Sequence, residues 1–298
     1  MKFFKAKESF TENIAFMGVM SAINIVLCLI MALLPVLSIV LIIALPLVSA
    51  LVELYCKDRY YPIYLVSTIA LAFVATLWNY GATINYLIPA VISGYIFGFV
   101  IKRKMLPIWG ILISGIINAG LVYAGFYLTS AILEIDVINT IRTFLLMSDN
   151  QYFDIIFPFF VLTMSLIEMS IAYFVIHFEV KKLGFEYPEN NPLIYVDIAI
   201  MVFSLLIIPM YFVSLAIAYI FLALAVYLTV FLIGEVITKK DARSLLFFAI
   251  SLVIGSVFTA LMFKIMKDGS FLLTLGLIAF LIALTNLIFY YLNKQEKK

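Results

Sequence analysis

The sequence predicts an all-α, polytopic integral membrane protein, a bundle of about ten transmembrane helices with its N-terminus and C-terminus in the cytoplasm. Three observations predict this fold. The 298 residues are 66% hydrophobic and 12% charged, whereas about 25% of residues are charged in an average soluble domain. Apolar runs long enough to cross a bilayer recur from end to end. When these runs are threaded through a membrane, most basic residues fall on one side.

Two long stretches without charged residues are each predicted to turn and cross the membrane twice. Residues 14–52 would form a single helix of about 58 Å, roughly twice the thickness of a bilayer core. Pro35 lacks a backbone donor and predicts a turn near the middle. Residues 198–234 contain Pro209 and are divided in the same way. The predicted spans are 13–34, 36–55, 62–79, 84–101, 106–130, 155–178, 193–212, 214–236, 244–263 and 271–292.

The distribution of basic residues tests the number of helices independently of hydropathy. With the N-terminus inside, sixteen of the nineteen Lys and Arg residues fall on the cytoplasmic side, and only Arg142, Lys264 and Lys267 fall outside. Treating either uncharged stretch as one crossing would move every later loop to the other side and scatter the positive charge. The positive-inside rule therefore favours ten helices, with eight as the alternative count.

The composition argues against several classes of function. The formal net charge is +2 and the longest basic run covers only residues 102–104, so no nucleic-acid partner is expected. A disulfide or a metal site is not expected, because Cys28 and Cys56 fall at different depths and His177 is the single histidine. The sequence contains no nucleotide-binding loop and implies no cofactor, so ATP-driven work would need a separate subunit.

A polar, proline-containing loop at 183–192 predicts a boundary between a six-helix domain, 1–182, and a four-helix domain, 193–298. The longest predicted outer segment, 131–154, contains four acidic residues and one arginine. Its apolar residues recur at near-helical spacing and predict a short amphipathic helix on the outer face. This helix is either a lid over a cavity or a connector at the lipid interface.

Glu168 is the strongest candidate for a functional residue, because a charged side chain at the bilayer centre costs at least about 2.5 kcal/mol. It lies near the middle of the sixth span, and Asn118 reaches a similar depth on the fifth. Together they form either the polar floor of a solute site or a clamp between two helices. Asn286 is expected to join helices, and Glu53 and Asp197 are expected to pair with Lys or Arg. With no second carboxylate near Glu168, an enzyme acting on a lipid-linked substrate is the weakest hypothesis.

Aromatic and amide side chains gather at the predicted outer ends of the third to fifth spans. Aromatic rings and amides can hold a planar metabolite, although Trp and Tyr also anchor helices at membrane interfaces. The amides are not typical anchors, but a tight turn at Gly81 would also explain them. The candidates for an outer rim of a ligand site are Trp78, Asn79, Asn85, Tyr86 and Tyr123.

Several features of residues 1–192 together resemble a known family. They are a short basic N-terminus, the small-residue stretch 15–22, Pro35 at the first turn, Leu45-Pro46-Leu47 in the second helix, and Lys181-Lys182-Leu183-Gly184 followed by Pro188 and Pro192. This pattern resembles the YybS-like bacterial membrane proteins. The N-terminal part of that family is in turn similar to the six-helix substrate-binding (S) components of energy-coupling-factor vitamin transporters.

The resemblance implies a bundle in the bacterial plasma membrane that captures a small metabolite from outside and docks sideways on a coupling subunit with its ATPases. In S components an Ala-x-x-x-Ala pattern on the first helix makes that contact. Gly18 and Ala22 match the pattern here, with Ala15 on the adjoining turn. Small residues four apart allow close backbone approach, either to a partner or within the same chain. Because the sequence has no vitamin-binding signature and four additional helices, a non-transporting membrane scaffold is the alternative function.

Overall fold

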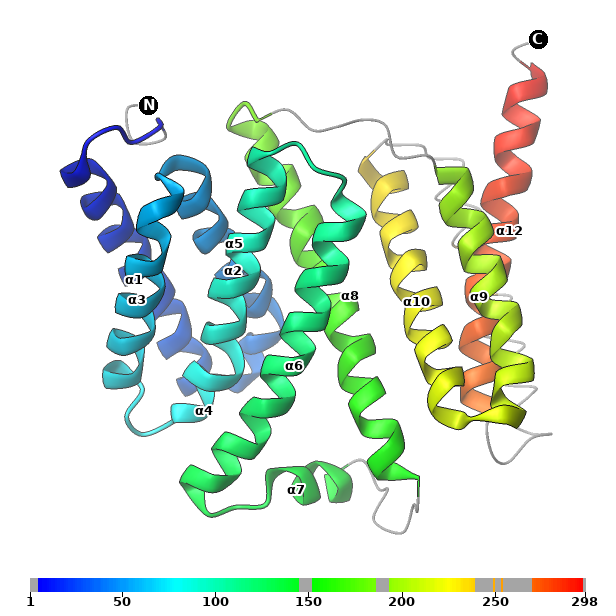
Figure 1. Ribbon diagram of the computed structural model, residues 1–298, viewed down its shortest axis with the longest axis horizontal. Coiled ribbons are helices and arrows are strands. Elements are labelled where there is room, and N and C mark those ends of the chain that lie inside the picture. Colours follow the sequence, from blue (N-terminus) through cyan, green and yellow to red (C-terminus); the bar gives the residue numbers. More distant parts are fainter. Residues whose placement is uncertain are drawn as a thin grey trace. The chain divides into compact units, whose positions relative to one another are not determined.

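The computed structural model describes residues 5–144, 152–185, 193–238, 249, 253 and 270–296. Within these residues every regular element is helical (Figure 1). Six helices of the described part are long and apolar enough to cross a membrane. Each predicted span overlaps a helix except 244–263, which lies outside the described residues apart from 249 and 253.

The helices are α1 (Phe10–Leu33), α2 (Ser38–Tyr55), α3 (Tyr61–Ala75), α4 (Tyr80–Ala82), α5 (Ile88–Lys102), α6 (Pro107–Leu133), α7 (Val137–Phe144), α8 (Phe153–Lys182), α9 (Leu193–Val213), α10 (Leu215–Thr238) and α12 (Ser270–Glu296). Short 3₁₀ turns, η1 (Pro35–Leu37) and η2 (Asp58–Tyr60), precede α2 and α3. A π-helical turn, η3 (Thr83–Leu87), joins α4 to α5.

Both uncharged stretches are divided into two helices. Pro35 lies at the turn between α1 and α2, as its missing backbone donor predicts. The second stretch turns at Ser214, between α9 and α10, and Pro209 lies inside α9. The predicted division between 212 and 214 therefore agrees with the second turn.

A capping box determines where α1 begins. The Ser9 hydroxyl accepts a hydrogen bond from the Glu12 backbone N–H at 3.2 Å, and Glu12 Oε2 accepts one from the Ser9 N–H at 3.1 Å. This reciprocal pair satisfies two backbone donors that a helix start otherwise leaves open. The helix therefore starts at Phe10, three residues before the predicted span.

The chain divides into two compact units. The first comprises residues 1–151 and 164–189, and the second comprises residues 152–163 and 190–298. The division at 189/190 falls inside the predicted loop 183–192. The first turns of α8 belong to the second unit, although this helix was placed entirely in the N-terminal domain from the sequence.

Within the first unit, α2 and α5 approach so closely that their contact requires glycine. A Cβ atom built on Gly94 would lie 2.6 Å from the Pro46 carbonyl oxygen and 3.0 Å from the Ala50 nitrogen. One turn further on, a Cβ atom on Gly98 would lie 2.9 Å from the Ala50 carbonyl oxygen. Small residues four apart on one helix allow this kind of backbone contact in membranes.

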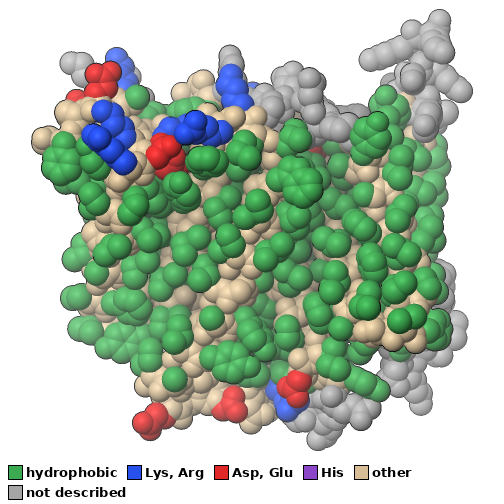
Figure 2. All heavy atoms as spheres, in the orientation of Figure 1, with side chains coloured by type: hydrophobic (Ala, Val, Ile, Leu, Met, Phe, Trp, Pro, Cys, Tyr) green, Lys and Arg blue, Asp and Glu red, His purple; other side chains and the backbone are tan. Residues whose placement is uncertain are grey.

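Basic side chains from separate segments gather at one end of the first unit, which we call the basic end (Figure 2). The Lys7 backbone N–H donates to the Tyr55 carbonyl at 2.8 Å, and Lys57 Nζ donates to the Glu8 carbonyl at 2.6 Å. The ring of Phe185, just after α8, contacts the Tyr55 ring at a centroid distance of 5.5 Å. The N-terminal segment, the α2–α3 turn and the C-terminal end of α8 therefore share one end.

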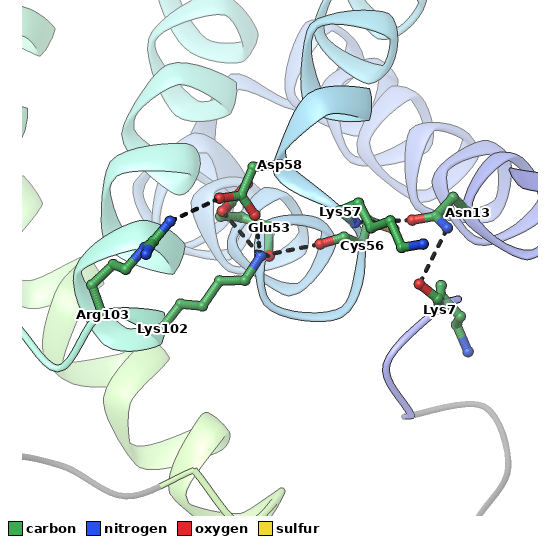
Figure 3. Close-up of polar contacts among 8 residues, drawn as sticks. All are labelled: Lys7, Asn13, Glu53, Cys56, Lys57, Asp58, Lys102 and Arg103. Atoms are coloured by element: carbon green, nitrogen blue, oxygen red, sulfur yellow. Dashed lines mark hydrogen bonds and ion pairs between the residues drawn. The ribbon is translucent and has the colours of Figure 1, made fainter. Parts of the chain in front are cut away.

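Lys102, the last residue of α5, contacts the end of α2 and the α2–α3 turn at the basic end (Figure 3). Its Nζ donates to the carbonyl oxygens of Glu53 at 2.8 Å and Cys56 at 3.1 Å. It also pairs with the fully buried Glu53 carboxylate at 3.4 Å and with Asp58. The hydrogen bond from Lys102 lowers the pKa of the Asp58 carboxyl. Glu53 is thus paired with a lysine, as the sequence predicts.

The amphipathic outer helix predicted from the sequence is α7. Its N-terminus is capped by the Asp136 carboxylate, which accepts the Asn139 N–H at 2.9 Å. The Ser130 hydroxyl near the end of α6 accepts the Val137 N–H at 3.1 Å. Since α6 leaves the basic end and α7 follows its other terminus, α7 lies at the opposite end of the first unit (Figure 1).

The described residues of the second unit include an apolar core and a polar pair between two helices. Ile207, Leu222 and Leu272 form a buried cluster between α9, α10 and α12. Asn286 Nδ2 on α12 lies 3.1 and 2.9 Å from the two carboxylate oxygens of Asp197 on α9. Asn286 therefore joins two helices, as predicted. Within the described residues Asp197 pairs with this amide and not with the predicted Lys or Arg, because its side chain is buried against α12.

Candidate functional site

Glu168 and Asn118 lie beside one another inside the first unit. The Asn118 amide is close enough to act on the Glu168 carboxylate, and Asn118 is only 1% exposed. Near them α6 and α8 are in close contact, since a Cβ atom on Gly115 would lie 2.5 Å from Leu166 Cδ2. Asn118 Nδ2 nevertheless has no hydrogen-bond partner of regular geometry among the described residues. The contact between Asn118 and Glu168 therefore does not use the full hydrogen-bonding capacity of the amide.

The register between α5 and α6 adds two serines to this pair. Asn85 lies against Gly125, and Val100 lies against Gly110. From the first contact to the second, the residue number rises on one helix and falls by the same amount on the other, so the two helices run antiparallel. This register places Ser93 of α5 nearly level with Asn118 of α6. Ser114 lies one turn before Asn118 on the same face of α6. Both serines are fully buried.

The four residues Ser93, Ser114, Asn118 and Glu168 form what we call the central cluster. They come from three helices and lie away from the helix ends: Glu168, for example, lies in the middle of the 30-residue α8. The hydroxyl oxygens of both serines are buried and have no hydrogen-bond partner among the described residues, and Asn118 Nδ2 is near Glu168 without a hydrogen bond of regular geometry. The cluster thus offers two free hydroxyl groups and an incompletely bonded amide close to one carboxylate.

Leaving these atoms unpaired is energetically costly. A buried polar group without a partner costs about 1–3 kcal/mol, and water is scarce at the centre of a bilayer. Most buried polar groups in proteins are paired for this reason. A solute or water molecule bound among the four side chains would recover this energy.

An aromatic pair borders the central cluster on the side of the basic end. Phe97 follows Ser93 by one turn of α5, and its ring contacts the ring of Tyr173 on α8 edge to face at a centroid distance of 5.4 Å. Both rings are buried. Because these rings fill the space toward the basic end, the polar groups of the cluster are shielded from that side.

The predicted outer rim is not gathered into one group. Trp78 is 61% exposed, as expected for an interface anchor. The hydroxyl groups of Tyr123 and Tyr127 lie 3.3 Å apart on an exposed face of α6. Asn79 Nδ2 donates to the Ala32 carbonyl on α1 at 3.4 Å, and Tyr86 is half-buried in η3. These four predicted residues thus have separate surroundings.

Asn85 is the rim residue with the most extensive contacts. Its amide nitrogen donates to the Gly81 carbonyl and to the Thr129 hydroxyl, each at 3.1 Å. Its Oδ1 is buried and has no hydrogen-bond partner among the described residues. The side chain sits in the π-helical turn η3, and such turns are frequent at functional sites. Asn85 therefore ties α4 to α6 and keeps one acceptor free.

The small residues of α1 face outward. Ala15, Gly18 and Ala22 are all exposed, and a Cβ atom on Gly18 would have no neighbour within 4 Å. Beside them a groove of about 340 Å³ runs between α1 and α3, lined in part by Gly18, Ala22, Ser67 and Leu71. The described residues do not cover this stripe, which disfavours the alternative that it packs within the chain.

Comparisons of this chain with protein-family models, with curated proteins and with solved structures give no match. Ser93 and Ser114 are the site residues that the sequence interpretation missed. Isolated serines are common on apolar helices, where the hydroxyl usually bonds a carbonyl of its own helix. Ser170 does so, donating to the Leu166 carbonyl at 2.7 Å, and only the helix register distinguishes Ser93 and Ser114 from it.

Proposed function

We propose that this protein is a membrane module that binds a small metabolite and serves in transport, similar to an S component. The observation that carries the proposal is the central cluster, in which two unpaired serine hydroxyls lie at the depth of the Asn118–Glu168 contact, away from the helix ends. A purely structural bundle would be expected to satisfy these groups internally. A solute site needs them free to bind its ligand.

The proposed topology has ten transmembrane helices and places both termini in the cytoplasm of a bacterial plasma membrane. The contacts at the basic end support it, because the N-terminal segment, the α2–α3 turn and Lys102 meet there. Cytoplasmic loops carry the excess of Lys and Arg in membrane proteins. In this topology α7 lies on the outer face.

A transport function requires partners, because no nucleotide-binding motif occurs in the sequence. We propose that a helix of a coupling subunit, which would bring the ATPases, seats on the α1 stripe. The open space at Gly18 and the groove beside Ala22 support this docking. Close approach of backbones at small residues gives dispersion contacts and weak hydrogen bonds in lipid.

The solute site is tested by native mass spectrometry of protein purified in mild detergent. The wild type should retain a small-molecule adduct, and Glu168→Gln should lose it while still inserting into the membrane. Glu179→Gln is the matched control, because Glu179 lies at the exposed end of the same helix and pairs with Lys182 at 2.6 Å. Equal retention of the adduct by all three proteins would overturn the assignment of the site.

A non-transporting scaffold is the second candidate, and the exposed groove between α1 and α3 favours it. Both functions predict that Gly18→Leu releases a bound membrane partner. Gly120→Leu is the control, since Gly120 also has open space around it but lies on α6. Copurification of a partner without any solute adduct would favour the scaffold over the transport module.

A further inference from the structure

The charge of the central cluster indicates which solutes it accepts. Glu168 is its only ionisable member, and no ion pair among the described residues includes it. The basic residues of α5 and α8, such as Lys102 and Lys182, lie at the helix ends. An anionic solute would place a second negative charge beside Glu168, where the surroundings screen charge poorly. A cationic solute would neutralise the carboxylate.

The remaining atoms of the cluster indicate a second group on the solute. Asn118 Nδ2 lies near the Glu168 carboxylate but forms no hydrogen bond of regular geometry, so it can still donate to an acceptor on the solute. The hydroxyl groups of Ser93 and Ser114 can each donate or accept, and both lack partners among the described residues. A solute that carries only a charge would leave these atoms unpaired. A hydroxyl group next to the charge would pair with them.

We propose that the central cluster binds a small organic monocation, an ammonium group with a neighbouring hydroxyl. The ammonium group contacts the Glu168 carboxylate, and the hydroxyl group accepts from Asn118 Nδ2 and bonds the two serines. The rings of Phe97 and Tyr173 close the cluster on the side of the basic end, which favours a short molecule. This inference rests on the proposed solute-binding function and names the chemical class of its ligand.

The test uses four probes of similar size and measures the thermal stabilisation of the full-length protein in detergent. Ethanolammonium carries both groups, ethylammonium lacks the hydroxyl, ethylene glycol lacks the charge, and glycolate carries the opposite charge. Ethanolammonium should stabilise the wild type at the lowest concentration, and ethylammonium should need about 2–10 times more, the usual effect of one neutral hydrogen bond. Glycolate and ethylene glycol should have no effect.

Variants assign the effect to the cluster. Glu168→Gln should weaken ethanolammonium binding at least about tenfold, because a hydrogen bond to a charged group is lost. Ser93→Ala and Ser114→Ala should each weaken it about 2–10-fold. Ser170→Ala is the matched control and should bind normally, since its hydroxyl bonds its own helix. Circular dichroism establishes that each variant is folded before binding is measured.

Other results would overturn the inference in distinguishable ways. If glycolate or ethylene glycol stabilises the wild type and Glu168→Gln abolishes this, the solute class is wrong and the proposed solute site stands. If replacing potassium by sodium alone gives a stabilisation that depends on Glu168, the ligand is a metal cation. If no probe acts and purified protein carries no solute adduct, both the inference and the proposed function fail.

Discussion

Replacing Gly94 by alanine should loosen the contact between α2 and α5. The added Cβ atom would lie 2.6 Å from the Pro46 carbonyl oxygen and 3.0 Å from the Ala50 nitrogen. Both are backbone atoms, so the clash is relieved only by moving one helix. Overpacking of this kind costs about 1–3 kcal/mol, and two backbone contacts place it in the upper part of that range. Alanine recovers about 1 kcal/mol through its better helix propensity.

The net loss in the free energy of unfolding should be about 1–2 kcal/mol. Gly120→Ala is the matched control, because a Cβ atom there meets nothing within 4 Å, and it should raise the stability by up to about 1 kcal/mol. At roughly 2–4 °C per kcal/mol, the melting temperatures of the two variants should separate by several degrees.

Both cysteines, Cys28 and Cys56, are free and buried, so a thiol-reactive fluorophore reports their exposure as the protein is heated in detergent. The control and Gly94→Ala are measured in the same experiment. A melting temperature of Gly94→Ala equal to or above that of the wild type would refute the close α2–α5 contact.

Three further predictions concern the charged and amide groups of the helix contacts. Lys102→Met should destabilise the first unit by about 3–5 kcal/mol, because the buried Glu53 carboxylate loses its cation; thermal unfolding measures this, and a loss below about 1 kcal/mol would contradict it. The pKa of Asp58 is lowered in the folded protein, so the ionised Asp58 contributes its full share to the free energy of unfolding above about pH 4, and this contribution is lost as the pH falls further. In Lys102→Met, stability should fall much less over this acid range. Asn286→Leu should cost about 1–3 kcal/mol, because the Asp197 carboxylate is left buried without its donor, and urea unfolding should register the loss.

The helical class of the described residues follows from the sequence because long apolar segments can enter lipid only as helices or closed barrels, and these segments are about as long as a spanning helix. The ends of the helices depend on local hydrogen bonds. The Ser9–Glu12 capping box is visible in the sequence and could have placed the start of α1 correctly. Likewise α3 ends at Ala75, before the predicted residue 79, because Thr76 and Asn79 form a turn in which the Asn79 N–H donates to the Thr76 carbonyl at 2.8 Å.

The composition of the central cluster could be predicted only in part. An acidic residue in mid-helix is so costly that Glu168 stands out in the sequence, and counting residues from the helix ends brings Asn118 to a similar depth. Ser93 and Ser114 carry no such signal, because a serine on an apolar helix costs little. The partner of Asp197 was also not predictable, since Asn286 lies 89 residues away in the chain.

The protonation state of Glu168 during ligand binding tests the account most directly. Infrared difference spectra of the membrane-reconstituted protein, recorded with and without ethanolammonium, report the carboxyl and carboxylate bands. Binding should increase the carboxylate band at the expense of the carboxyl band, or leave a carboxylate that shifts in frequency, and Glu168→Gln should abolish the change while Glu179→Gln retains it. A spectrum that does not respond to ethanolammonium, or responds equally in Glu168→Gln, would contradict a solute site at the central cluster.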